Sequence, residues 1–255
     1  MDHSLTEENL ITSRQVYNAE QGRRELVKCY KLEAEKTGVP ANVLQLISAH
    51  RVLAGPDIVE LLDVIPVPQA EKIYLVFEDF EYSLAHPPQL TSDEVRRIMK
   101  ELLTALTRLH ARKYAHQGLS PQHILLDSQL HVKLTGLAAA RMLLRPAGGR
   151  TFQPSAYQAP ELLSSPTAGS PAADMWAVGC IFAELHTGHC LFSSQPETEQ
   201  LSYVRGVVGG SCHPLAGQVP NLSDEGKDLL EALLEFEASK RLTAAAALSH
   251  AYLAS

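Results

Sequence analysis

The sequence predicts an α+β fold, with a small strand-rich part at about residues 1–80 and a larger helical part at about residues 81–255. Two observations predict it. Short runs rich in β-branched and aromatic residues lie before residue 80, whereas helical periodicity and helix-capping residues dominate after residue 90. No internal repeat or low-complexity tract interrupts the chain, so we expect a single domain over residues 1–255.

Four runs in the first part have the composition of strands. They are QVYNA (15–19), ELVKCYKL (25–32), DIVELLDVI (57–65) and KIYLVFE (72–78). The first two predict a β-hairpin whose turn lies near Gln21–Gly22. One helix is expected between the second and third runs.

The second part begins with a predicted amphipathic helix, because Thr91 and Glu94 form a capping-box pattern. Its apolar residues then recur at helical spacing: Val95, Ile98, Met99, Leu102, Leu106 and Leu109. The segment ADMWAVGCIFAEL (173–185) is apolar on all sides, which is typical of a buried helix, and Thr187–Gly188 is expected to end it. Further helices are predicted to start at Ser223 and near Thr243.

The charge balance argues against a nucleic-acid-binding protein. Acidic residues outnumber basic ones by 29 to 22, the formal net charge is −7, and no basic run is present. Apolar runs are too short for a membrane span, and the N-terminus lacks the pattern of a signal peptide. The four cysteines show no metal-ligand spacing. We therefore expect an intracellular protein, cytoplasmic or nuclear, that contacts neither nucleic acid nor membrane.

Several motifs, in the correct order, resemble protein kinases of the cyclin-dependent type, in the CMGC group. HQGLSPQHILLD (116–127) resembles the catalytic loop HRDLKPxNILLD, and VKLTGLAAAR (132–141) resembles the strand and metal-binding turn VKLxDFGLAR. The remaining matches are TGVPANVLQLIS (37–48), IYLVFEDF (73–80), YQAPELL (157–163), DMWAVGCIFAEL (174–185) and KRLTAAAALSHAYL (240–253). The resemblance implies a two-lobed kinase fold, with the N-lobe at about 1–80 and the C-lobe at about 81–255.

The residues that the family uses for phosphoryl transfer are replaced in this chain. Gly118 stands at the position of the catalytic-loop aspartate, Gln117 at the preceding arginine and Ser120 at the loop lysine. Glycine has no side chain to orient or deprotonate an attacking hydroxyl. We interpret the catalytic positions as degraded.

The two side chains that would hold Mg²⁺ are also replaced, by His123 and Gly136. Mg²⁺ prefers oxygen ligands, and an imidazole nitrogen is a poor substitute. A transition-metal site built from His123, His116 and His131 is the alternative; we favour histidines that are exposed or satisfied within the structure. We therefore expect no metal.

The nucleotide-binding positions are only partly kept. Counting back from Val16–Tyr17 places Asn9, Ile11 and Arg14 where the family has three glycines, and side chains there are expected to crowd a nucleotide. Lys28 matches the strand lysine that contacts phosphates; it is either a remnant of that contact or a strand lysine that packs through its stem. Its helix partner, normally glutamate, is Leu46. Phe77 matches the gatekeeper position beside adenine.

The residues that hold the helical lobe together are kept. Glu161 and Arg241 are expected to form the family's buried ion pair, and Asp174 and Trp176 open the buried helix. The position of the activating threonine falls on Gly149, with Thr151 nearby. The stretch between LSYVRGVVGG and NLSDEGKDLL is much shorter than the insert that cyclin-dependent and related kinases carry there.

This pattern favours a catalytically inactive kinase-like domain, a pseudokinase, that acts as an interaction or regulatory module. Its expected partners are proteins, a cyclin-like protein or an active kinase among them. The helix at PANVLQL keeps Val43, Leu44 and Leu46, which suit either a cyclin-like partner or the domain core. The alternatives are a residual serine/threonine kinase that uses ATP and a switch that binds ATP without metal. No cofactor is expected, although ATP binding without Mg²⁺ stays open.

Overall fold

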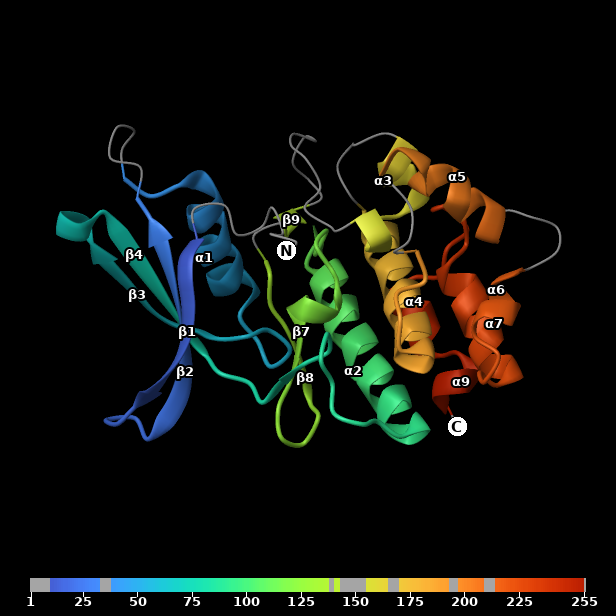
Figure 1. Ribbon diagram of the computed structural model, residues 1–255, viewed down its shortest axis with the longest axis horizontal. Coiled ribbons are helices and arrows are strands. Elements are labelled where there is room, and N and C mark those ends of the chain that lie inside the picture. Colours follow the sequence, from blue (N-terminus) through green and yellow to red (C-terminus); the bar gives the residue numbers. More distant parts are fainter. Residues whose placement is uncertain are drawn as a thin grey trace.

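The computed structural model describes residues 10–32, 38–137, 140–142, 155–164, 170–192, 197–208 and 214–254. A β-sheet with one helix lies at one end of the molecule, and a larger helical part lies at the other (Figure 1). The strands are β1 (Leu10–Asn18), β2 (Arg23–Lys31), β3 (Leu61–Val67), β4 (Lys72–Glu78), β5 (Tyr82–Ser83), β6 (Tyr114–Ala115), β7 (Ile124–Leu126), β8 (Val132–Leu134) and β9 (Arg141–Met142).

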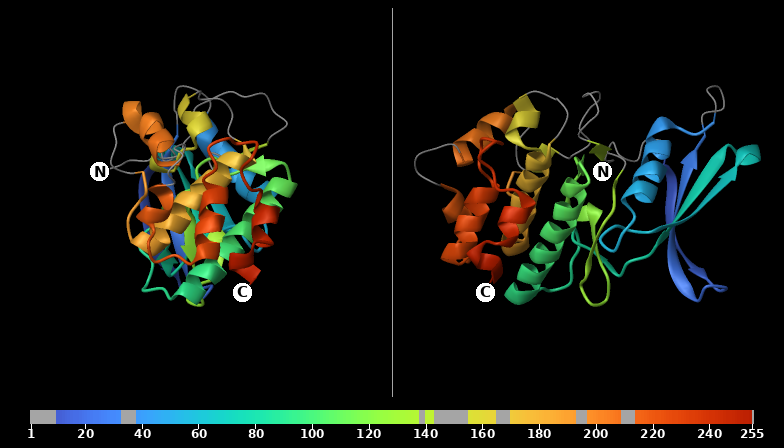
Figure 2. Two further views of the ribbon diagram at one scale, coloured as in Figure 1. Left: turned by 90° about the vertical axis from the view of Figure 1, so that its right-hand side faces the viewer. Right: turned by 180° about the vertical axis from the view of Figure 1, so that it is seen from behind.

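The helices lie mainly in the second part. They are α1 (Ala41–Leu53), α2 (Ser92–Ala111), α3 (Pro160–Ser164), α4 (Pro171–Thr187), α5 (Glu197–Val208), α6 (Pro214–Gln218), α7 (Asp224–Leu233), α8 (Ala244–Leu248) and α9 (Ala251–Ala254). Short 3₁₀ turns occur at Pro68–Ala70, Pro121–His123 and Ser155–Tyr157. This arrangement is the predicted two-lobed α+β fold, and the right-hand view of Figure 2 shows the same separation of sheet and helices.

The larger sheet has the antiparallel order β1-β2-β4-β3. The predicted hairpin is confirmed: β1 pairs with β2 in the register Asn18↔Arg23, and the turn contains Gly22 at φ 64°. A positive φ suits glycine because it has no Cβ. The strand predicted at 72–78 matches β4 residue for residue.

The prediction of one strand over 57–65 is wrong in its first half. Strand β3 begins only at Leu61, and the preceding residues cross to the other lobe. There Ile58 forms a parallel bridge with Leu134, and the Val59 amide donates to the Leu134 carbonyl at 2.9 Å. Ile58 and Val59 are therefore apolar because they are buried in a segment that crosses between the lobes. A run of apolar residues does not by itself show whether the run is such a segment or a strand.

The predicted helix boundaries are confirmed by their caps. Thr91 and Glu94 make both hydrogen bonds of the capping box at the start of α2. Ser223 and Thr243 cap α7 and α8 by accepting from backbone amides. Gly188 ends α4 with φ 76°, the left-handed conformation that glycine adopts without strain.

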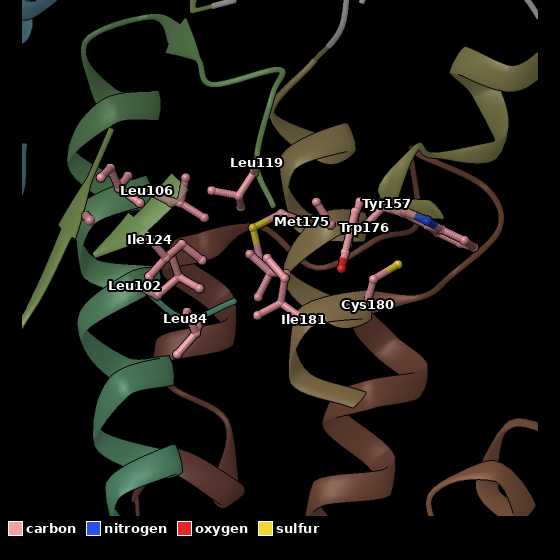
Figure 3. Close-up of a cluster of buried hydrophobic side chains, with 14 of the residues drawn as sticks. Leu84, Leu102, Leu106, Leu119, Ile124, Tyr157, Met175, Trp176, Cys180 and Ile181 are labelled. Carbon is pink, nitrogen blue, oxygen red and sulfur yellow. The ribbon is translucent and has the colours of Figure 1, made fainter. Parts of the chain in front are cut away.

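The helical lobe packs around α4, whose middle is fully buried. Leu102 and Leu106 of α2 face Met175 and Ile181 of α4, with Leu119 between them (Figure 3). All five side chains are 0% exposed. Burying such side chains stabilises the fold by roughly 1.5–3 kcal/mol each. The chain segment around Leu119 is thus held on the core of this lobe.

The predicted ion pair is confirmed, with the Arg241 side chain fully buried and the Glu161 side chain 30% exposed. The Arg241 guanidinium donates to both carboxylate oxygens of Glu161, at 2.9 and 3.0 Å. It also donates to the carbonyl oxygens of Glu235, Phe236 and Ala172. The bidentate geometry and the extra carbonyl partners offset the cost of burying the charge. This pair ties α3 to the chain that follows α7.

Candidate functional site

The loop at 116–123 is anchored to α4 by Asp174, whose carboxylate is buried. One carboxylate oxygen accepts from the His116 amide at 2.8 Å, and the other accepts from the Gln117 amide at 2.9 Å. His110 contacts the same carboxylate at 2.9 Å. These bonds fix the loop backbone while Gln117 adopts φ 60°, a conformation that non-glycine residues rarely take. The loop therefore has a defined shape even though its side chains differ from the family pattern.

Three of the replaced positions, Gly118, Ser120 and His123, contact one another. His123 Nδ1 lies 2.6 Å from the Gly118 carbonyl oxygen and 3.3 Å from Ser120 Oγ. The short distance to a carbonyl, which only accepts, means that Nδ1 carries the proton of the ring. The imidazole of His123 is thus used to hold the loop backbone.

The fourth replaced position, Gly136, lies directly against the His123 ring. A Cβ built on Gly136 would lie 2.4 Å from His123 Cδ2, well below any normal contact. Gly136 also has φ 75°, so a side chain there would be strained in addition. His123 fills the space that a side chain at position 136 would need. The two replacements at the metal-ligand positions are therefore sterically complementary.

The histidines of this cluster are held in their neutral form. Burial lowers the pKa of His123 to about 4, and it also lowers the pKa of His116. The His116 Nε2 lies 2.8 Å from the Thr135 carbonyl, and its Nδ1 accepts from the Gly118 amide at 3.3 Å. The two rings lie 6.0 Å apart. Neither ring contributes a charge at neutral pH, and none of the four replaced positions carries a carboxylate.

A further histidine that the sequence reasoning missed, His50 of α1, belongs to the same region. His50 is 3% exposed, its Nδ1 contacts the Val59 carbonyl at 2.9 Å, and its ring lies 5.0 Å from the Phe77 ring. Burial lowers the pKa of His50 to about 4. Its Nε2 makes no hydrogen bond in the described part of the chain. The sequence carried one signal for this histidine: helical spacing places position 50 on the same face of α1 as Val43 and Leu46.

Lys28 of strand β2 interacts electrostatically with this histidine cluster. Its positive charge contributes to the lowered pKa of both His50 and His123, which places it within electrostatic range of both rings. Strand register puts Lys28 opposite Ser13, so the two side chains share one face of the sheet. Lys28 is therefore close enough to the histidines to affect their titration, and it shares the sheet face of Ser13.

Two of the three positions where the family has glycine are described, and both belong to a strand. Ile11 and Arg14 lie within strand β1, where Ile11 falls at an irregularity of the register. Arg14 is opposite Val27 and so lies on the face away from Lys28. The expectation that Arg14 crowds a nucleotide is therefore corrected: Ser13 is on that face instead. Asn9 lies outside the described residues.

Phe77 is buried at the end of β4 and is followed by the segment 79–81, which joins the two lobes. Gln15 donates to both carboxylate oxygens of Asp79, at 3.0 and 3.2 Å. Arg24 pairs with Asp79 at 3.6 Å and with Glu81 at 2.5 Å. Side chains of the β1–β2 hairpin thus reach directly onto the lobe-joining segment, where the family resemblance places the adenine-binding backbone.

The apolar residues of α1 divide between the core and the surface. Val43 and Leu46 are 1% and 7% exposed, whereas Leu44 is 53% exposed. The core interpretation is confirmed for Val43 and Leu46. Leu46 cannot pair with Lys28, because an aliphatic side chain carries no charge.

Other expectations fall where the structure gives no description. Gly149, Thr151 and Cys212 lie outside the described residues, and so does Ala138 of the metal-binding turn. Within the described ranges, no group of three or more His, Cys, Asp or Glu side chains is arranged to hold a metal ion. In the same part of the chain, no helix combines the length and the hydrophobicity that a membrane crossing needs.

The fold and the retained anchors agree with the comparison to known protein families. The matching family is described as "Protein kinase domain", and the match covers residues 12–253. This chain belongs to the protein kinase family. Within that family, the kinase domain is similar to cyclin-dependent kinases.

Three curated relatives illustrate the similarity of this kinase domain. Cyclin-dependent kinase B2-1 of Arabidopsis thaliana is 30% identical, over 94% of this chain and 90% of the relative. Two proteins of Trypanosoma brucei brucei are also similar. Cell division control protein 2 homolog 3 is 30% identical over 92% of this chain and 86% of its own length, and homolog 2 is 32% identical over 91% and 75%.

The histidines of the site predict that stability falls on acidification. Because the pKa of His50 and of His123 is lowered to about 4 in the folded state from a reference of 6.5, the unfolded chain binds more protons between these values. The stability present above pH 6.5 is therefore lost as the pH falls towards 4. Each histidine is expected to contribute up to about 1.4 kcal/mol per pH unit. Urea denaturation at pH 7.5, 6.5, 5.5 and 4.5 measures this slope.

Two variants test whether His50 and His123 cause the decrease in stability with falling pH. His50→Leu and His123→Asn are each expected to make the decrease below pH 6.5 shallower. The control Leu229→Ala removes a buried side chain of α7 and is expected to lower stability by roughly 2–5 kcal/mol without changing the slope. An unchanged slope in both histidine variants would contradict the assignment.

Proposed function

We propose that this kinase domain is a pseudokinase that acts as a protein-interaction or regulatory module. The observation that carries the proposal is the contact between His123 and Gly136. A catalytic kinase needs acidic or amide oxygens at these positions to hold Mg²⁺ beside the phosphates. Here one position has no side chain, and the other packs against it and bonds to the Gly118 carbonyl.

The donor set at this place does not fit Mg²⁺. A magnesium ion requires near-octahedral oxygen coordination, and the neutral imidazole of His123 offers only its Nε2 lone pair. Gly118, at the position of the catalytic aspartate, offers no side chain to orient a substrate hydroxyl. We therefore derive no phosphoryl-transfer step for this chain. Loss of a single such group typically costs orders of magnitude in rate, and several are lost together.

The retained groups support a scaffolding role. Asp174 still fixes the loop backbone, and Glu161 still pairs with Arg241. These interactions maintain the shape of the helical lobe and take no part in chemistry. Because relatives include a protein named a cyclin-dependent kinase, we propose that the partners are proteins, a cyclin-like protein or an active kinase among them.

The central test measures ATP binding and turnover on the full chain. We expect ATP to leave the melting temperature unchanged within about 1 °C, with or without Mg²⁺, since a ligand stabilises only the state that it binds. We also expect no transfer of the γ-phosphate to protein substrates. Magnesium-dependent stabilisation with transfer would overturn the proposal in favour of a residual serine/threonine kinase.

Lys28 gives the test a second outcome. ATP could stabilise the chain without Mg²⁺, and this stabilisation could be lost in Lys28→Met. That result would favour a metal-independent nucleotide switch over the proposed scaffold. The electrostatic interaction of Lys28 with His123 is the observation that favours this second candidate. Lys31, an exposed residue of the same strand, provides the control, because Lys31→Met should leave any such stabilisation in place.

A further inference from the structure

A groove is lined by residues of α5, of α6, of α7 and of the segment that follows α7. These three helices lie at the end of the helical lobe that is farthest from the sheet (Figures 1 and 2). It encloses about 290 Å³. Its apolar lining includes Val207 of α5, Leu215 of α6, and Leu234 and Phe236 after α7. Pockets for drug-sized ligands begin at roughly 300 Å³, so this space suits one or two side chains of a peptide.

The floor of the groove is part of the folded core. Val207, Leu215 and Leu234 are 6%, 4% and 1% exposed. Phe236 is half-buried, and the Arg205 guanidinium lies 5.5 Å from the centre of its ring. A floor whose side chains are fixed by the core needs little reordering to accept an apolar group, which favours binding.

The rim of the groove is acidic. Asp228, Glu231 and Glu235 all line it. Asp228 and Glu231 are three residues apart on α7 and so share one face of the helix, where like charges destabilise it by roughly 0.2–0.5 kcal/mol. A cationic group placed between them would relieve this repulsion.

The chain itself neutralises this rim only in part, through Arg205 over the Phe236 ring and through Lys240, which interacts electrostatically with Glu235 as well as with Glu237. Asp228 contacts His250 at 3.0 Å, and Lys240 pairs with Glu237. Within the described residues, neither Glu231 nor Glu235 forms an ion pair, and the Glu235 carboxylate accepts only a backbone amide. The rim thus carries negative charge that an external partner can neutralise.

We propose that this groove binds a segment of a protein partner in which one large apolar side chain lies between lysine or arginine residues. The apolar side chain fills the space over Leu215 and Leu234, and the basic residues pair with Glu231 and Glu235. Charge complementarity selects this occupant over an acidic or a neutral segment. The proposal rests on the interaction role proposed above and gives the chemistry of one partner.

The test uses a synthetic peptide in which Leu-Phe is flanked on each side by two arginines. It is titrated into the full chain labelled with ¹³C in the methyl groups of leucine and valine. We expect saturable shifts at Val207, Leu215 and Leu234, with none at Leu75 in the sheet. A peptide with Ser-Ser in place of Leu-Phe should bind at least about tenfold more weakly, because the apolar area is no longer buried.

Charge variants test the rim. Glu231→Lys is expected to weaken the Kd about tenfold at 0.05 M salt and only about twofold at 0.5 M, since salt screens exposed charges. Glu235→Gln should act in the same direction more weakly. Glu20→Lys, at an exposed residue of the β1–β2 turn, makes the same change of charge and should alter the Kd less than twofold.

Several results would overturn the proposal that the groove binds such a peptide. They are shifts confined to other regions, equal binding of the Ser-Ser peptide, and equal weakening by Glu20→Lys. Self-association of the chain that Glu231→Lys abolishes would mean that a second copy fills the groove instead. Phosphoryl transfer would overturn the proposed function without affecting the peptide result, so the two failures are distinguishable.

Discussion

Replacing Gly136 by aspartate, the residue that catalytic relatives are expected to have, should lower the free energy of unfolding by about 2–5 kcal/mol. Left-handed backbone costs a non-glycine residue roughly 1–2 kcal/mol, and overpacking adds about 1–3 kcal/mol. The overpacking follows from the 2.4 Å approach of a Cβ at 136 to the His123 ring. Chemical denaturation of Gly136→Asp and of the parent chain measures the difference.

A double-mutant cycle separates the two causes. The double variant Gly136→Asp with His123→Asn should recover about 1–3 kcal/mol, because the smaller side chain removes the clash. Gly188→Asp is the control for backbone strain alone, since Gly188 has φ 76° and nothing lies within 4 Å of its added Cβ. Additive effects of the two changes would mean that His123 and position 136 do not compete for space. Neither variant should gain phosphoryl transfer while Gly118 is present.

Replacing Asp174 by alanine is expected to lower the free energy of unfolding by about 3–5 kcal/mol, as for the loss of a buried, fully bonded charge. The carboxylate accepts from the His116 and Gln117 amides and contacts His110, and its side chain is 0% exposed. Without it, buried amides lose their acceptor. Hydrogen exchange at the Gln117 amide should accelerate by orders of magnitude in a variant that is still folded.

Two further variants define the size of this effect. Asp174→Asn keeps one carbonyl acceptor and should cost less than Asp174→Ala. Asp93→Ala removes an exposed carboxylate, 89% accessible and paired with Arg96, and should change stability by less than about 1 kcal/mol. If Asp174→Ala were no more costly than Asp93→Ala, the anchoring role of Asp174 would be wrong.

Local patterns of the sequence predicted the elements well. The caps at Thr91 and Ser223 and the end of α4 at Gly188 were predicted correctly, because capping depends on residues within one helical turn. The strand at 57–65 was predicted to begin four residues too early, since β3 begins at Leu61. The first residues of the predicted strand are apolar because they are buried where the chain crosses between the lobes. Burial in a strand and burial in such a crossing segment give the same run of apolar residues.

The sequence by itself determined the fold class, the kinase-like order of motifs and the identity of each replaced residue, including Gly118, His123 and Gly136. It also determined the Glu161–Arg241 pair through the family resemblance. Only the tertiary structure decided that the His123 ring fills the space beside Gly136, that His50 packs under Phe77, and that Glu231 and Glu235 border a groove with buried apolar residues in its floor. Residues far apart in the chain meet through packing, and local periodicity carries no information about which of them become neighbours.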